Sequence, residues 1–224
     1  MLWQEDRESK EHAGPGPSHH HCTRKGFLGF DLTLNLMNSF IYFWSWAYER
    51  VRMVNFNQEG LLVPGIHPYN IIDLRSQFVA GFPYSSSRAL IWERFLSFVE
   101  IIVNTFGEYS PLEAWIDGSF VTDKEEPNDI DIVFHFSLAS WNQYNGDIGD
   151  IWEDIRNIGL TSFMTDSYWA VQVNNETENY SNVVNMRNYW RGQFGFDRGN
   201  RPKGFLAVSM NDIIESAREV GLNE

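Results

Sequence analysis

The sequence is poor in cysteine and in basic residues, and both shortages limit what the chain can be. Cys22 is the only cysteine among 224 residues, so no disulfide can form within the chain, and we expect a reducing, cytoplasmic location. The 17 Lys and Arg residues are outnumbered by 30 Asp and Glu residues, which gives a formal net charge of −13. Such a chain repels duplex nucleic acid, so extensive duplex binding is disfavoured. A small nucleotide bound with a divalent cation stays compatible, because the cation reverses the local sign of charge.

The first 52 residues lack the regular pattern of a globular domain. Residues 1–25 are polar and predict disorder, whereas residues 27–48 are rich in apolar side chains and form a candidate helix. Three polar residues interrupt that apolar run, which disfavours a membrane span and favours a core or docking helix: Asp31, Asn35 and Asn38. A membrane-tethered protein is the less favoured alternative. Met53 is also a candidate for the true start, with residues 1–52 as an upstream extension.

After Met53, apolar residues recur with regular periods. Intervals of three and four predict a helix over 88–105, and strict alternation predicts a strand over 128–136. Further helices are expected at 71–79, 151–158, 180–190 and 212–220, strands at 113–116 and within 161–173, and a hairpin of 194–196 with 204–210. Helices mixed with a few strands predict one α/β (α+β) domain over residues 53–224.

The most informative segment is Trp115–Val133. Gly118-Ser119 follows a predicted strand, where glycine allows close backbone approach and a helix start presents N–H groups to a phosphate. Asp129 and Asp131 are two residues apart on the next predicted strand, so their carboxylates project from the same face. Oxygen ligands at this spacing suit Mg²⁺, which binds through few carboxylates and the phosphates of a substrate. An exposed strand face with two solvated aspartates is the alternative interpretation.

This pattern, Gly-Ser, a spacer and then Asp-x-Asp between aliphatic residues, resembles the signature of the polymerase-β-like nucleotidyltransferase superfamily. More narrowly, residues 53–210 resemble a family of small uncharacterised prokaryotic proteins of that superfamily. Three motifs carry the narrower resemblance: Glu59–His67, Trp115–Thr122 and Tyr189–Arg198. The resemblance implies a nucleotidyltransferase-type fold, in which helices flank a small mixed sheet.

The resemblance also implies roles for individual residues. Gly118 and Ser119 would bind the triphosphate, and Asp129 and Asp131 would hold Mg²⁺, for which Mn²⁺ can substitute. A third carboxylate from a later strand usually completes the catalytic and metal site of this superfamily. Asp166 is the candidate, because it lies in an apolar, strand-like run.

Several other residues are weaker candidates. Asp150 and Asp154 compete with Asp166 for the third carboxylate. The basic residues have two interpretations: they neutralise phosphates, or they are ordinary surface charges. Lys124 in the spacer is a candidate nucleotide-binding residue, and four others lie near the chain's end: Arg191, Arg198, Arg201 and Lys203. His135 lies on the same strand face as the two aspartates, but a lone strand histidine is more often structural.

These features favour a Mg²⁺-dependent enzyme that transfers a nucleoside monophosphate from an NTP, with ATP as the first choice. The acceptor is not identified by the sequence. Small members of the superfamily often act in toxin–antitoxin or phage-defence pairs, which is an analogy. The alternative is a catalytically inactive module that binds a nucleotide or a protein partner.

Overall fold

The computed structural model describes residues 56–144, 147–172 and 180–221, all within one compact unit, Tyr48–Glu224. The expectations for residues 1–52, and for a start at Met53, lie outside these ranges. No helix in the described ranges is both long enough and apolar enough to cross a membrane.

Helices and strands alternate along this part of the chain. The elements are β1 (Gly65–Tyr69), α2 (Ile71–Arg75), the π-helix η1 (Ser76–Ala80), α3 (Ser87–Phe106), the 3₁₀ turn η2 (Gly107–Tyr109), β2 (Glu113–Asp117), the 3₁₀ turn η3 (Ser119–Val121), β3 (Ile130–Ser137), α4 (Leu138–Gln143), α5 (Ile148–Ser162), β4 (Thr165–Gln172), α6 (Tyr180–Phe194), β5 (Gly204–Ser209) and α7 (Met210–Gly221).

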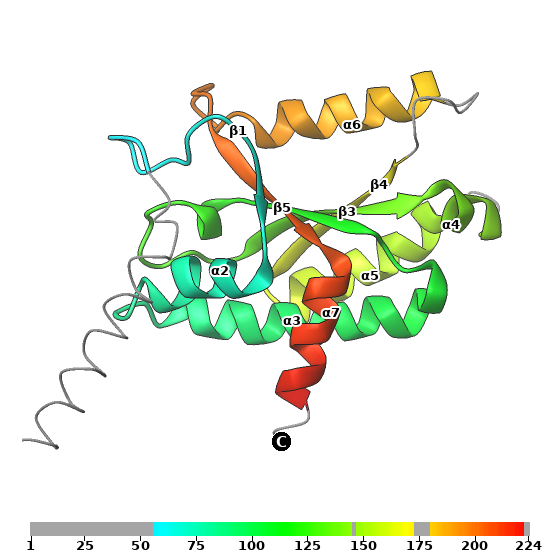
Figure 1. Cartoon of the computed structure of the whole chain (residues 1–224), viewed down its shortest axis with the longest axis horizontal. Helices are drawn as coiled ribbons and strands as arrows, with labels where there is room; N and C mark the ends of the chain where they lie inside the picture. Colours follow the sequence, from blue (N-terminus) through cyan, green and yellow to red (C-terminus); the bar gives the residue numbers. More distant parts are fainter. Residues whose placement is uncertain (1–55, 145–146, 173–179, 222–224) are drawn as a thin grey trace, which may run out of the picture. The chain divides into compact units, whose positions relative to one another are not determined.

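The five strands form one mixed sheet in the order β1-β5-β2-β3-β4. β1 runs parallel to β5 and β3 runs parallel to β4, whereas the central pairs β5–β2 and β2–β3 are antiparallel. Helices flank this sheet (Figure 1), so the predicted α/β class with a small mixed sheet is confirmed.

The two faces of the sheet differ in what covers them. The larger core lies between one face and helices α2, α3, α5 and α7, and the alternating residues of β3 enter it fully buried, as their period predicts: Ile130, Ile132, Phe134 and Phe136. A smaller apolar cluster lies between the opposite face and α6, with Trp115, Val133 and Phe194 among its members. Figure 1 shows α6 alone above the sheet and the other long helices below it.

α3 is the predicted long amphipathic helix. Its inward stripe includes Ile91, Phe95, Phe98 and Ile102, each without measurable exposure. The helix ends at Gly107, whose positive φ of 56° suits a residue without Cβ. The stripe was predicted from the sequence.

Two predicted elements differ from the structure. The expected hairpin of 194–196 with 204–210 is wrong, because Phe194 ends α6 and only a single bridge joins Phe196 to Pro202. β5 instead pairs with β1 and β2, since a nearly buried strand needs a neighbour on each side. The strand expected within 161–173 starts only at Thr165, because Thr161 and Ser162 complete α5.

Candidate functional site

Three aspartates form a row across neighbouring strands on the α6 side of the sheet. Asp131 on β3 is paired in register with Asp117 on β2 and with Asp166 on β4. Asp129 precedes β3 and has the same strand parity as Asp131. We refer to Asp117, Asp129, Asp131 and Asp166 as the acidic row. The row therefore joins the two aspartates of the predicted metal site to the predicted third carboxylate.

Asp131 lies at the centre of the acidic row and is only partly exposed. Burial, and then the negative charges of Asp129 and Asp166, raise its pKa to about 6. The positive charges of Lys203 and Arg198 act in the opposite direction but do not balance these effects. The centre of the row is thus short of positive charge, which is the electrostatic condition that favours binding of a cation.

Asp117 forms a buried ion pair with a lysine. Lys203, directly before β5, places Nζ 2.6 Å from both carboxylate oxygens of Asp117. Both residues are buried, with 4% and 8% of their surfaces exposed. Burial raises the pKa of Asp117 to about 7, although the ion pair with Lys203 opposes the shift.

Asp166 is held from the other side of the row. Arg156 of α5 reaches Oδ1 of Asp166 with Nε at 2.9 Å, and the Tyr168 hydroxyl donates to Oδ2 at 2.8 Å. The Arg156 guanidinium also lies 4.8 Å from the centre of the Tyr168 ring. Both Nε and Nη2 of Arg156 lie 2.9 Å from Oδ1 of Asp166, whereas Oδ2 accepts one hydrogen bond, from Tyr168, and keeps one further lone pair.

Gly118 brings the backbone against the centre of the row. Its φ of 82° lies in the left-handed region, and a Cβ added there would overlap the Asp131 carboxylate. Ser119 follows and begins the single 3₁₀ turn η3, a short helical start directly after Gly-Ser. Gly118 and Ser119 are both partly exposed beside the aspartates, as a phosphate-binding turn would require.

The spacer between Gly-Ser and Asp-x-Asp is anchored to α3. Arg88 is fully buried, and its guanidinium donates to four backbone carbonyls: those of Phe78, Phe120, Thr122 and Lys124. Glu126 accepts hydrogen bonds from the backbone N–H groups of Ser86 and Ser87, at 2.8 and 2.9 Å. Glu126 thereby caps the N-terminus of α3. The spacer is consequently fixed at both its start and its end.

The basic candidates separate into distinct groups. Lys124 is exposed on the spacer, and Arg191 is exposed on α6. Arg201 is paired with Asp197 and Glu59, so it is an ordinary surface cation. Arg198 is exposed and close enough to Asp131 to lower its pKa. Lys203 and Arg198 are thus the two cations of this group that lie near the row.

His135 lies under α6 rather than in the row. Its ring is fully buried 4.2 Å from the Trp115 ring, and neither ring nitrogen has a hydrogen-bond partner. Burial, and then the charge of Arg187 on α6, lower the pKa of His135 to about 3. The neutral imidazole behaves as a packed core residue, which agrees with the structural interpretation.

Asp150 and Asp154 are exposed on α5, which packs against the face of the sheet opposite the acidic row. The structure therefore places Asp166, and not these two, beside Asp131. In the described ranges, no three His, Cys, Asp or Glu side chains converge into a ready-made metal site. A divalent cation at Asp129 and Asp131 would take its remaining oxygens from a bound phosphate or water, which suits Mg²⁺.

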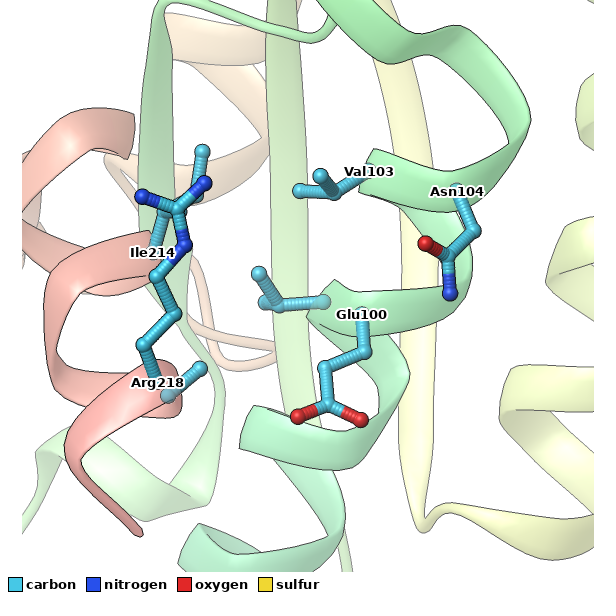
Figure 2. A pocket seen from close by; sticks show the side chains of 7 residues that line it. Glu100, Val103, Asn104, Ile214 and Arg218 are labelled. Carbon is cyan, nitrogen blue, oxygen red and sulfur yellow. The ribbon is translucent and has the colours of Figure 1, made fainter. Parts of the chain in front are cut away.

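A separate pocket of about 260 Å³ lies between α3 and α7, with Glu100, Asn104 and Arg218 around an apolar floor (Figure 2). These helices cover the face of the sheet opposite the row. The pocket is thus no part of the acidic site.

Sequence reasoning missed several residues that shape the site. Asp117 precedes the Gly-Ser pair and has a strand parity that could have placed it beside the Asp-x-Asp motif. No local signal identifies its partner Lys203, which is 86 residues away. The same holds for Arg88 and Arg156, because only the folded chain brings them to the spacer and to Asp166.

The profile of a family of unknown function, DUF6932, matches residues 54–209. That match covers more than half of the chain, so the chain belongs to this family. No curated protein and no solved structure matches the chain.

Proposed function

We propose that this member of DUF6932 is a Mg²⁺-dependent nucleotidyltransferase of the polymerase-β-like type, acting on an NTP. One observation carries the proposal. The Asp131 carboxylate lies against the Gly118 backbone and between two further aspartates, so carboxylates suited to a metal ion and a turn suited to a phosphate lie at one place. Its cytoplasmic location, ATP as first-choice nucleotide and a defence or toxin context belong to the same proposal.

In this proposal, the residues divide the work of binding. Asp129 and Asp131 would hold Mg²⁺, and Asp166 would complete the site through the remaining lone pair of Oδ2. Gly118 and Ser119 contact the triphosphate, while exposed Lys124 and Arg198 supply positive charge to it. Bound Mg²⁺ supplies charge stabilisation at the phosphates.

The reaction is a displacement at the α-phosphorus. An acceptor oxygen forms a bond to that phosphorus, the bond to the β-phosphate bridging oxygen breaks, and pyrophosphate leaves. The proton of the acceptor hydroxyl passes to a carboxylate of the acidic row, directly or through water. Arg156 and Tyr168 keep the Asp166 carboxylate in one orientation during the transfer.

A second function is favoured by the contacts of Asp166. Since Arg156 and Tyr168 already engage both of its oxygens, a domain that binds an NTP without transferring it is the alternative. A nucleotide-binding or protein-interaction module of this kind would retain the turn at Gly118 and lack turnover.

Transfer of label from α-³²P-labelled NTPs, with Mg²⁺ and candidate protein, tRNA and small-molecule acceptors, tests the proposal. We expect labelled product from the wild type and from Asp154→Asn, a matched control on the opposite face, and a loss of about 10²-fold or more in Asp131→Asn. Equal labelling by wild type and Asp131→Asn would exclude the proposed site. Mg²⁺-dependent NTP binding without any labelled product would favour the non-catalytic alternative.

A further inference from the structure

The two outer carboxylates of the acidic row are each paired with a cation that the chain supplies. Lys203 pairs with Asp117 on one side, and Arg156 pairs with Asp166 on the other. Within the described residues, no basic side chain forms an ion pair with Asp129 or Asp131. The row is therefore neutralised at both ends and open in the middle.

The net charge of this arrangement matches one divalent cation. When all four carboxylates are ionised, the two paired cations leave two negative charges, at Asp129 and Asp131. Exposed Arg198 acts on Asp131 without forming an ion pair with it in the described residues. A two-metal centre brings four positive charges to ions about 3.5–4 Å apart, twice the charge that Asp129 and Asp131 neutralise. The row has no unpaired carboxylate left for a second ion.

Lys203 also occupies the space that a second ion would need. Its Nζ lies 2.6 Å from both oxygens of Asp117, the residue paired in register with Asp131. A second ion shared by Asp131 and Asp117 would have to displace the ammonium group from a position that is almost fully buried. The backbone holds Lys203 in place as well, because its N–H donates to the Gly195 carbonyl and β5 begins at the next residue.

We propose that Lys203 takes the place of a second metal ion, so that the acidic row binds a single divalent cation per chain, at Asp129 and Asp131. This inference rests on the proposed function and adds the stoichiometry and the role of Lys203. Lys203 is a positioning residue here. It fixes Asp117 and sets the charge of the row without contacting the acceptor.

A crystal structure with Mn²⁺ and either α,β-methylene-ATP or tripolyphosphate counts the ions directly through their anomalous scattering. Tripolyphosphate makes the result independent of the base. We expect one Mn²⁺ peak, between Asp129 and Asp131, with Lys203 still on Asp117. Two peaks, with Lys203 displaced, would overturn the inference and leave the proposed function standing. The absence of any Mn²⁺ peak in the acidic row would contradict both the proposed function and this inference.

Mn²⁺ titration followed by electron paramagnetic resonance tests the charge argument in solution, with the metal alone as the probe. Lys203→Met removes a positive charge and vacates the space beside Asp117. At a pH above the raised pKa of that carboxyl, where Asp117 is ionised, we expect roughly tenfold tighter Mn²⁺ binding or a second bound ion. Lys203→Met combined with Asp117→Asn restores the net charge, and we expect one ion with affinity within about twofold of wild type. Arg201→Met, which removes an exposed cation nearby, is the matched control and should match wild type.

Thermal unfolding identifies any variant that fails to fold. If Lys203→Met alone does not fold, the number of Mn²⁺ ions bound by the wild type and by the double variant still tests the inference. Two bound Mn²⁺ ions in wild type, or unchanged binding in a folded Lys203→Met protein, would contradict the role given to Lys203.

Discussion

Gly118 has the tightest steric requirement of any residue in the acidic site. Its positive φ alone would disfavour a side chain, but the nearby Asp131 carboxylate leaves no room for a Cβ at all. Gly107 separates the two effects, because its φ of 56° is also positive while nothing lies within 4 Å of an added Cβ. Substitutions at these two glycines therefore separate the cost of backbone strain from the cost of steric overlap with Asp131.

We expect Gly107→Ala to cost about 1–2 kcal/mol in the free energy of unfolding, from backbone strain alone. Gly118→Ala should cost more, and should also weaken Mg²⁺-dependent NTP binding about tenfold or more because it moves Asp131. Urea denaturation and calorimetric titration measure the two effects. Equal losses of stability with unchanged NTP binding would show that Gly118 has no special place beside Asp131.

His135 is expected to make the folded state sensitive to acid. Its pKa of about 3 in the folded protein lies below its usual value of about 6.5, so the unfolded chain binds the proton more readily. The contribution to stability is complete above pH 6.5 and is lost as the pH falls towards 3. The loss is about 1.4 kcal/mol per pH unit. Arg187 on α6 is the charged group that acts on this ring, and Glu113 on β2 is the register partner of His135.

His135→Leu removes this titration without removing a hydrogen bond, since neither ring nitrogen has a partner. We expect the variant to be at least as stable as wild type at pH 8 and more stable by about 2 kcal/mol at pH 5. Urea denaturation across this pH range gives the comparison. Parallel stability curves for the two proteins would show that His135 does not titrate as its burial implies.

Among the elements, the spacer and α3 depend on each other. Arg88, at the start of α3, donates hydrogen bonds to backbone carbonyls of the spacer, and Glu126 of the spacer caps the helix. The helix start and the loop that leads to Asp129 therefore form one structural unit. Because the spacer backbone leads directly to Asp129, a substitution that breaks either contact is expected to shift the position of Asp129.

Glu126→Gln tests this coupling at the helix end. The backbone N–H groups of Ser86 and Ser87 hold the pKa of Glu126 at about 2, below its usual 4.5. Its contribution to stability is thus present above pH 4.5 and lost as the pH falls towards 2. We expect the variant to unfold at lower urea concentration than wild type at pH 7, with the difference vanishing near pH 2. Glu153→Gln, exposed on α5, is the control and should match wild type at both pH values.

Local patterns and long-range contacts differ in how well the sequence predicted them. Period and spacing predicted α3, the core face of β3 and the shared face of Asp129 and Asp131, since these depend on neighbours in the chain. The pairing of β5 with β1 and β2 was missed because both partners are distant in sequence, and the nearby turn at Asp197 suggested a hairpin. The partners of Asp117 and Asp166 were missed for the same reason.

For the whole molecule, the sheet order creates the site. β3 lies between β2 and β4, so three strands each bring one aspartate to the same level, and α6 covers only the neighbouring part of that face. The larger core closes the opposite face, so among the described elements the acidic row lies on the side that carries fewer helices. We propose that this row and the Gly118 turn bind a metal-complexed triphosphate.

Calorimetric titration of each NTP into the wild-type chain and into Asp131→Asn, with and without Mg²⁺, tests that claim most directly. We expect wild type to bind at least one NTP only when Mg²⁺ is present. Binding should fall about tenfold or more in Asp131→Asn and stay unchanged in Asp154→Asn, on the far side of the sheet. No Mg²⁺-dependent binding in wild type, or equal binding by wild type and Asp131→Asn, would contradict the claim.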